Sequence, residues 1–559
     1  MSKLLVEVKL GPRAELFNVK YQTKNKFYRD NINIDTDQYR IILDGVFVNR
    51  LDLCTHYRKE QWSEVINELV NHYGLTFHER LRGSYYGLIY DKQRSEWCFF
   101  GDEINSKPLF YYQSKDFVLM GNNIFDMVSH IKSKGDSVSI SIPSCYDLLT
   151  RGFMVESNTI VSEINRLRTG FRLRGSNDLA YTECYYKISL KSDNSIKMSD
   201  AVEIVDDLFL KAIDRNFKLD DDYRFKHIAS LSGGLDSRMT VMMAHKMGYD
   251  DQLNFTFAQS GTLDSEIASQ IASDLNHEWI FQFLDNGNFL KNLDQTTQVS
   301  QGLALYFGFS HGYSMIKNIN LDNYGVVHTG QVGDAVIGSF MNTPTGQDRI
   351  DPNGGGHSLA FLEKQSLMDL NFYENQEHFM IYNRALGAAN MGSNVYYQYT
   401  ESLSPFLDHD FLSSLYNIPL SLRYDHRLYK KWILTKHPEC ARYIWEGIGC
   451  RIDSPMARRL SIGKYSIIWN RIPAFVLRGL RVQPDKWNDK THMNPIGYYY
   501  SHNDSLRKWM NSYVNESIDL LDFDKELKHD CLRLFNSGNC LEKNLTLSLL
   551  GMIKAIDKC

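Results

Sequence analysis

The stretch Ser232-Gly233-Gly234-Leu235-Asp236-Ser237 decides the fold of the larger part of this chain. It follows a short apolar run, Ile228 to Leu231, that is typical of a buried parallel strand. It precedes apolar residues at helical spacing, from Met239 to Met247, which Gly248 ends. Adjacent glycines let backbone N–H groups converge on an anion, and the dipole of the following helix adds positive charge at the same place. The stretch therefore predicts a phosphate-binding turn.

This glycine turn is not a Walker A loop, because no Gly-Lys-Ser/Thr follows it, and transfer of the γ-phosphate of ATP is disfavoured. It resembles the SGGxDS loop of the ATP pyrophosphatase (PP-loop) superfamily. In these enzymes a carboxylate or amide oxygen of the substrate attacks the α-phosphate of ATP and forms an adenylated intermediate. The resemblance implies that Asp236 holds Mg²⁺ on the phosphates, as a hard oxygen ligand. It also implies ATP contacts from Leu231, Ser232, Gly233, Gly234 and Ser237. The alternative is an ordinary turn rich in serine and glycine.

A second loop follows the predicted strand Tyr324 to His328 and reads Thr329-Gly330-Gln331-Val332-Gly333-Asp334-Ala335. It resembles the SGEGxDE loop of asparagine synthetases and the TGYGAD loop of β-lactam synthetases. The resemblance implies ATP contacts from Thr329 and Gly330, and a second Mg²⁺ carboxylate from Asp334. Gln331 stands at a catalytic position where asparagine synthetases carry a glutamate, and a neutral amide cannot act as a base. The presence of glutamine in place of glutamate argues against a standard asparagine synthetase.

Two further segments bear on the ATP site. The predicted strand Leu253 to Ala258 precedes a helix that Asp264-Ser265-Glu266 opens and that ends near His277. In asparagine synthetases the end of the equivalent strand holds the adenine, so Phe257, Ala258 and Gln259 are candidates, with plain α/β packing as the alternative.

The stretch from Trp445 to Arg451 lacks a lysine that relatives carry there to neutralise negative charge on the adenylate. Arg451 is the candidate substitute, because a guanidinium can bind phosphate oxygens in a forked geometry. The alternative is a surface arginine without a catalytic role.

The N-terminal segment, from Leu4 to about Lys132, contains short apolar or alternating runs and one helical stretch, Gln61 to Tyr73. The pattern predicts layered antiparallel sheets. Asp44–Asn49, Leu81–Gly87 and the segment from Asp102 to Tyr111 resemble the NGEIYN, LxGxFA and D…GxKPLYY motifs of class II (Ntn-type) glutamine amidotransferase domains.

Two departures from those motifs bear on the glutaminase reaction. Such a glutaminase uses an N-terminal cysteine as nucleophile, but this chain has Ser2, whose hydroxyl ionises far less readily than a thiol. Asp44 replaces an asparagine of the oxyanion segment, where a carboxylate would oppose developing negative charge. We therefore predict that this domain does not hydrolyse glutamine.

The length of 559 residues requires more than one domain. We predict an amidotransferase-like domain at 1–132, a connector at 133–198 with a small β element from Gly170 to Arg174, a PP-loop domain at 199–460 and a helical extension at 461–559. A helix capped by Ser199 or Asp200 should open the PP-loop domain. The fold class is α/β and α+β multidomain, with an Ntn-like layered antiparallel-sheet domain followed by a parallel-sheet domain.

Composition narrows the possible partners. The net charge of -5 argues against a general nucleic-acid or anionic-membrane surface, and no apolar run approaches the roughly 20 residues needed to cross a bilayer. Nine cysteines without a CxxC pair indicate a reduced, cytoplasmic protein. The sequence leaves a homodimer open.

The resemblance to the asparagine synthetase family covers most of the chain. It implies an ATP- and Mg²⁺-dependent, AMP-forming ligase that adenylates a small-molecule carboxylate for amide formation with ammonia or another amine, as β-lactam synthetases and lasso-peptide cyclases do. The alternatives are a glutamine-hydrolysing asparagine synthetase and a degenerate nucleotide-binding protein without catalysis.

Overall fold

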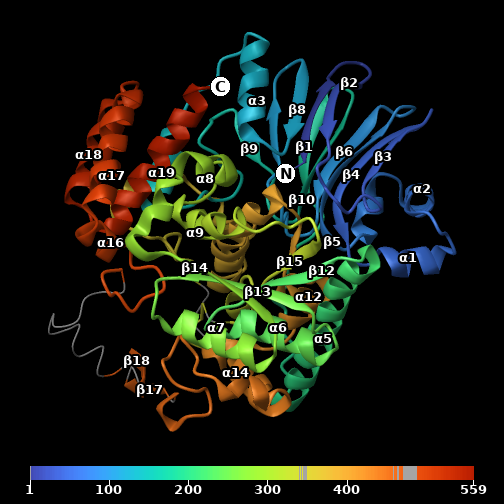
Figure 1. The fold of residues 1–559 in the computed structure, drawn as a ribbon. Coiled ribbons are helices and arrows are strands. Elements are labelled where there is room, and N and C mark those ends of the chain that lie inside the picture. Colours follow the sequence, from blue (N-terminus) through green and yellow to red (C-terminus); the bar gives the residue numbers. More distant parts are fainter. Residues whose placement is uncertain are drawn as a thin grey trace.

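The computed structural model describes residues 2–338, 340–341, 343, 349–457, 459–462, 465–469, 472 and 487–559. Two antiparallel sheets come from the N-terminal third, a parallel sheet comes from the middle, and helices end the chain (Figure 1). The predicted fold class is therefore confirmed. Among the described helices, none combines the length and the apolarity needed to cross a membrane.

The two antiparallel sheets pack face to face. The first has the order β2-β1-β8-β7-β9 and the second β11-β10-β6-β5-β4-β3. Their strands are β1 (Lys3–Lys9), β2 (Glu15–Gln22), β3 (Ile32–Asp35), β4 (Tyr39–Phe47), β5 (Gly83–Asp91), β6 (Glu96–Gly101), β7 (Phe110–Gln113), β8 (Phe117–Gly121), β9 (Ile164–Arg166), β10 (Phe171–Ser176) and β11 (Leu179–Cys184). Alternate residues such as Val6 and Leu88 meet in the core between the sheets. The outer face of the second sheet is covered by α2 (Trp62–Tyr73), with α1 (Arg50–Tyr57) beside it.

The domain boundary near residue 132 is corrected by the structure. The predicted boundary coincides with the end of α3 (Ile124–Ser133). The range beyond it, predicted as a connector, supplies α4 (Ile142–Thr150) and the strands β9, β10 and β11. These strands complete both antiparallel sheets, so the sheets extend to Cys184. Pairing of β10 with β6 joins residues far apart in the sequence, which local patterning does not reveal.

The parallel sheet has the order β14-β13-β12-β15-β16. Its strands are β12 (Lys226–Ser230), β13 (Gln252–Ala258), β14 (Glu278–Phe283), β15 (Tyr324–His328) and β16 (Ser402–Leu403). The chain adds β13 and β14 on one side of β12, and then adds β15 on the other side. The strand order therefore reverses between β12 and β15. In open parallel sheets, ligands bind beyond the carboxyl ends of the strands at such a switch point.

Helices cover both faces of this sheet, as Figure 1 shows: α5 (Met198–Tyr223), α6 (Leu235–Lys246) and α7 (Leu263–Asp274) on one, and α8 (Leu293–Ser300) and α9 (Phe307–Ile316) on the other. The helix α5 begins two or three residues earlier than predicted, with Lys197 as its N-cap in place of Ser199 or Asp200. The helix α7 ends three residues before His277.

Later elements complete the fold. They are α10 (Gly333–Ile337), α11 (Gln376–Phe379), a π helix (Met380–Leu386), α12 (His409–Leu415), α13 (Leu420–Arg423), α14 (Arg427–Lys436), β17 (Arg459–Ile462), β18 (Tyr465–Ile468), α16 (Ile496–His502), α17 (Asp504–Ser517), α18 (Lys525–Ser537) and α19 (Cys540–Asp557). The antiparallel pair β17–β18 lies at the start of the range 461–559 that was predicted as a helical extension, and α16 to α19 follow it.

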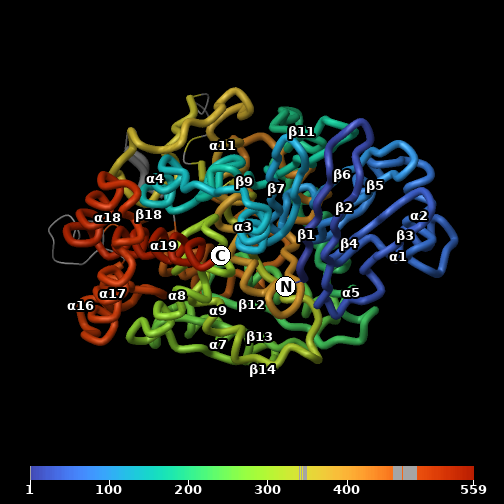
Figure 2. The backbone as a smooth tube through the Cα atoms, turned by 90° about the horizontal axis from the view of Figure 1, so that it is seen from above, coloured from blue at the N-terminus to red at the C-terminus, as the bar shows by residue number. Residues whose placement is uncertain are grey.

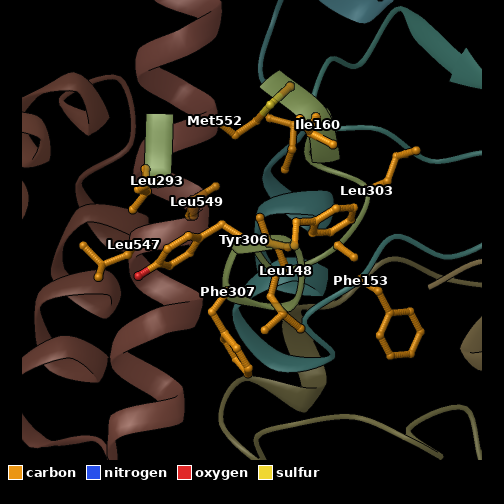
Figure 3. Packing of buried hydrophobic residues seen from close by; sticks show 14 of the residues in the cluster. Leu148, Phe153, Ile160, Leu293, Leu303, Tyr306, Phe307, Leu547, Leu549 and Met552 are labelled. Atoms are coloured by element: carbon orange, nitrogen blue, oxygen red, sulfur yellow. The ribbon is translucent and has the colours of Figure 1, made fainter. Parts of the chain in front are cut away.

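The C-terminal helices belong to the main core. Figure 3 shows Leu549 of α19 packed in one cluster with Leu148 of α4 and Tyr306, and this cluster also contains Phe153. Seen from above in Figure 2, the C-terminal helices and the N-terminal sheets lie at opposite ends of the molecule, with α3 and both chain ends between them.

Candidate active site

The glycine turn lies at the carboxyl end of β12. The strand ends at Ser230, and α6 begins at Leu235 with Gly234 as its N-cap. The hydroxyls of Ser232 and Ser237 lie 3.0 Å apart, and Ser237 Oγ also accepts a hydrogen bond from the backbone N–H of Ser232 (3.0 Å). This turn is therefore ordered by its own serines at the positive end of α6, where a phosphate group would be stabilised.

Asp236 and Asp334 meet across the switch point. The backbone N–H of Asp334 donates to Asp236 Oδ2 (2.8 Å), and the hydroxyl of Tyr429 donates to Asp236 Oδ1 (2.8 Å). Burial, and then the charge of Asp334, raise the pKa of Asp236 well above its usual range. A divalent cation between these loops would remove that penalty, so the donor set fits Mg²⁺.

Close approach of the two loops depends on glycine. A Cβ on Gly330 would lie 2.3 Å from the backbone nitrogen of Ser237, closer than real contacts allow. The next turn holds Val332 at a φ of 56°, a left-handed conformation that β-branched residues rarely adopt. The side-chain amide of Gln331 donates a hydrogen bond to the carbonyl of Ala389. The second loop is thus shaped to bring its backbone against the first.

A buried carboxylate fixes the strands that carry these loops. Asp220 of α5 accepts a hydrogen bond from the backbone N–H of Val326 (2.8 Å). Its Oδ2 lies 2.8 Å from Nε2 of His328 on β15 and 3.2 Å from Nδ1 of His227 on β12. All three side chains are buried. This network ties both strands to one helix just before the two loops begin.

A cavity of about 320 Å³ opens between the loops. Most of the predicted ATP-binding residues line it, namely Leu231, Ser232, Gly234, Asp236, Ser237, Thr329 and Gly330, together with Gln331. Residues that the sequence did not single out also line it, namely Ser230, Phe255, Thr256, Asp264, Val332, Tyr396 and Met493. Phe255 and Thr256 could have been inferred from the strand that holds Phe257, but Tyr396 and Met493 come from distant segments and gave no local signal.

Five predicted residues do not line this cavity: Gly233 and Asp334, which belong to the two loops, and Ala258, Gln259 and Arg451, which lie outside the loops. Ala258 and Gln259 are buried outside the lining of this cavity, and the Gln259 amide donates to Asp285 (2.8 Å). Phe257 does line the cavity. Arg451 is exposed and forms an ion pair with Asp453, so the structure does not bring it to the two loops.

A different arginine anchors the glycine turn. The buried guanidinium of Arg238 donates to the carbonyls of Gly233 (3.0 Å) and Cys440 (3.0 Å), and also to those of Tyr443 and Ile444. Burial lowers its pKa to about 10. The turn is thereby fastened to the segment that leads into Glu446.

This segment brings a second pair of carboxylates beside Gly233. The backbone N–H of Gly233 donates to Asp264 Oδ1 (3.2 Å), while its carbonyl accepts from the backbone N–H of Glu446 (3.2 Å). Burial, and then the charge of Glu446, raise the pKa of Asp264 to about 7. The edge of the cavity is therefore strongly acidic.

The N-terminal half contains a separate polar cluster. Ser2 Oγ accepts a hydrogen bond from the backbone N–H of Lys24 (3.0 Å), and buried Asp44 accepts one from the hydroxyl of Tyr21 (2.9 Å). Nearby, Lys107 pairs with buried Glu401 (2.8 Å), whose pKa burial raises to about 7. A cavity of about 50 Å³ between this half and the parallel sheet is lined in part by Ser84, Ser106 and Thr329. Thr329 thus lines both cavities.

Comparisons with known proteins agree with parts of this architecture. Residues 35–186 match the family model of a glutamine amidotransferase domain. Over 273 residues the chain is 21% identical to "Asparagine synthetase [glutamine-hydrolyzing] 1" of Bacillus subtilis, an alignment that covers 47% of this chain and 42% of that protein.

Two solved structures overlap only loosely. The glutamine phosphoribosylpyrophosphate amidotransferase of B. subtilis gives a TM-score of 0.21 at 9% identity, over 75% of this chain and 87% of its own. An allosteric regulatory enzyme of purine biosynthesis gives 0.22 at 8% identity, over 50% and 74%. The chain is thus similar to a glutamine amidotransferase domain over residues 35–186, and to an asparagine synthetase over 47% of its length.

Proposed function

We propose that this protein is an ATP-dependent, AMP-forming ligase that adenylates a carboxylate and joins it to ammonia or another amine. The observation that carries the proposal is the meeting of Asp236 and Asp334 at the switch point, beside a glycine turn that opens a helix. Two carboxylates from separate loops can hold Mg²⁺, and the backbone N–H groups beside them can bind the phosphates of a nucleoside triphosphate.

The protein's own groups would act by binding and orienting. The N-terminus of α6 and the hydroxyls of Ser232 and Ser237 would face the pyrophosphate end of ATP, while Asp236 and Asp334 would hold Mg²⁺. Bound Mg²⁺ would neutralise phosphate charge. Tyr429 keeps the Asp236 carboxylate in place through its hydrogen bond. Gln331 is neutral and cannot act as a base, so the proposal rests catalysis on positioning and electrostatics.

The amine is proposed to arrive as free ammonia or on another molecule. Ser2 stands in place of the cysteine nucleophile, and the buried carboxylate of Asp44 would oppose an oxyanion at the glutamine site. Release of glutamate from glutamine by the purified protein would contradict this choice of amine. It would favour the second candidate, a glutamine-hydrolysing asparagine synthetase. The small cavity that reaches Thr329 from the N-terminal half is compatible with that candidate.

The test is ATP–pyrophosphate exchange with purified protein and Mg²⁺, scanned over aspartate, glutamate and other carboxylates. Exchange with one carboxylate is the expected result, and asparagine formed from aspartate and ammonia would identify asparagine synthesis. ATP binding without exchange across a broad panel would support a nucleotide-binding protein without catalysis. Absence of ATP binding would overturn the proposal.

A further inference from the structure

The predicted ATP site needs more positive charge than Mg²⁺ alone provides. Asp236, Asp334, Asp264 and Glu446 surround the glycine turn, and the nucleotide would add its own negative charge. Arg238 is already committed to backbone carbonyls, and Arg451 pairs with Asp453 at the surface. Since the segment around Gly447 has no lysine, another cation should serve the site.

Arg384 is the candidate for this additional cation. It lies in the π helix Met380–Leu386, which packs on α10, the helix whose first turn carries Asp334. Single-turn π segments often occur at functional sites, because they shift side chains out of the regular helical register. Arg384 is half-buried, so part of its side chain remains accessible to a ligand.

The aliphatic stem of Arg384 is held by packing. Its guanidinium carbon lies 5.7 Å from the ring centroid of Phe153. A Cβ on Gly355 would come within 2.9 Å of Arg384 Cδ, which shows how closely that backbone lies against the stem. Packing of this kind orients the side chain without using its N–H donors.

The guanidinium donors themselves are not engaged. Within the described part of the chain, no group accepts a hydrogen bond from Arg384, although a guanidinium offers five N–H donors. Burial lowers the pKa of Arg384, and the charge of Asp334 partly offsets this effect. An oxyanion beside Asp334 would supply the missing acceptors, and forked guanidinium–oxyanion hydrogen bonds are among the stronger ones.

We propose that Arg384 binds an oxyanion of the reactants beside Asp334 and so provides the positive charge for which the segment around Gly447 has no lysine. This inference rests on the proposed function, since it assumes that a nucleotide and a carboxylate occupy the site. The oxyanion belongs either to a phosphate of the nucleotide or to the carboxylate substrate. A phosphate presents a tetrahedral set of oxygens and a carboxylate a planar pair, and a guanidinium can bind two oxygens of either group in a forked geometry.

The experiment compares R384M, R384K and the matched control R533M with the wild type. Arg533 also lies over a phenylalanine ring, Phe361, at 4.9 Å, but it is on the exposed surface of α18. Calorimetry measures the affinity for MgATP, and pyrophosphate exchange measures the KM of the carboxylate. Thermal unfolding verifies that each variant is folded, and R384Q replaces R384M if the latter does not fold.

We expect R384M either to bind MgATP more weakly or to show a higher KM for the carboxylate, in each case by on the order of 10- to 100-fold, as removal of a charged hydrogen bond predicts. Loss of MgATP affinity identifies the phosphate as the ligand, and a raised KM identifies the carboxylate. R384K should recover part of the loss, and R533M should match the wild type. Unchanged values for R384M in both measurements would overturn the proposal, and the MgATP measurement decides alone if no carboxylate supports exchange.

This design separates the two claims. If the wild type binds MgATP but exchanges with no carboxylate, the proposed ligase activity fails while Arg384 is still judged by MgATP affinity. If exchange occurs and R384M equals the wild type, only the inference about Arg384 fails. If the wild type does not bind MgATP, both fail.

Discussion

The backbone N–H of Asp334 donates a 2.8 Å hydrogen bond to Asp236 Oδ2, which joins two loops that follow different strands of the parallel sheet. This bond places two carboxylates at the point where the strand order reverses. The arrangement is costly for an isolated protein, because the partly buried carboxylate of Asp236 lies close to the negative charge of Asp334. It becomes favourable when a cation lies between them.

The first prediction concerns this pair. Asp236→Asn should abolish ATP–pyrophosphate exchange, with a loss of about 100-fold or more, because the amide does not replace a carboxylate ligand of Mg²⁺. The wild type should unfold at a higher temperature when Mg²⁺ and ATP are added, and the variant should lose this increase. Asp178→Asn, at an exposed turn, is the control and should keep the shift. An equal shift in Asp236→Asn would show that the carboxylate does not bind the metal.

A second prediction concerns pH. The pKa of Asp264 is raised from 3.8 to about 7 by burial and by Glu446. A carboxyl group with a raised pKa in the folded state destabilises the fold when it ionises, so the free energy of unfolding should fall between about pH 4 and pH 7. Asp264→Asn should reduce this decline, as measured by urea denaturation at several pH values. Identical pH profiles for the variant and the wild type would contradict the assignment.

A third prediction tests the contact between the loops. Gly330→Ala would place a Cβ 2.4 Å from the carbonyl carbon of Asp236, so the loops must separate. Because misplacement by about 1 Å can cost on the order of 100-fold in rate, exchange activity should fall by a similar factor. Gly308→Ala is the matched control, since a Cβ there meets no atom within 4 Å. Comparable activity in both variants would mean that the loops tolerate separation.

A fourth prediction concerns the anchor of the glycine turn. Arg238→Met removes a charged donor from the carbonyls of Gly233, Cys440 and Ile444, and among the described residues only the Gly233 carbonyl keeps another donor, the N–H of Glu446. The free energy of unfolding should fall by about 3 kcal/mol, since each unsatisfied buried group costs about 1 to 3 kcal/mol. Guanidinium chloride denaturation measures the change. Exposed Arg442→Met in the same segment should leave stability close to that of the wild type, and a similar loss in both variants would argue against the anchoring role.

The sequence predicted the elements whose signals are local. The strand, turn and helix around Ser232–Ser237 follow from an apolar run, two glycines and helical spacing, and the structure places β12 and α6 there. The helix Gln61 to Tyr73 was likewise predicted to within one residue, as α2. Asp236 and Asp334 were named as partners from two separate loops, and the structure brings them into direct contact.

Only the tertiary structure decided which distant groups meet these loops. Tyr429 and Tyr396 reach the site from segments far along the chain, while Arg451 lies at the surface. The strands β9 to β11 join sheets whose other members lie far earlier in the sequence. The physical reason is that hydrophobic spacing and glycine placement report on the backbone of one segment, whereas contacts between segments depend on how complete elements pack. The sequence by itself therefore determined the two loops and their carboxylates, and packing determined the side chains that surround them.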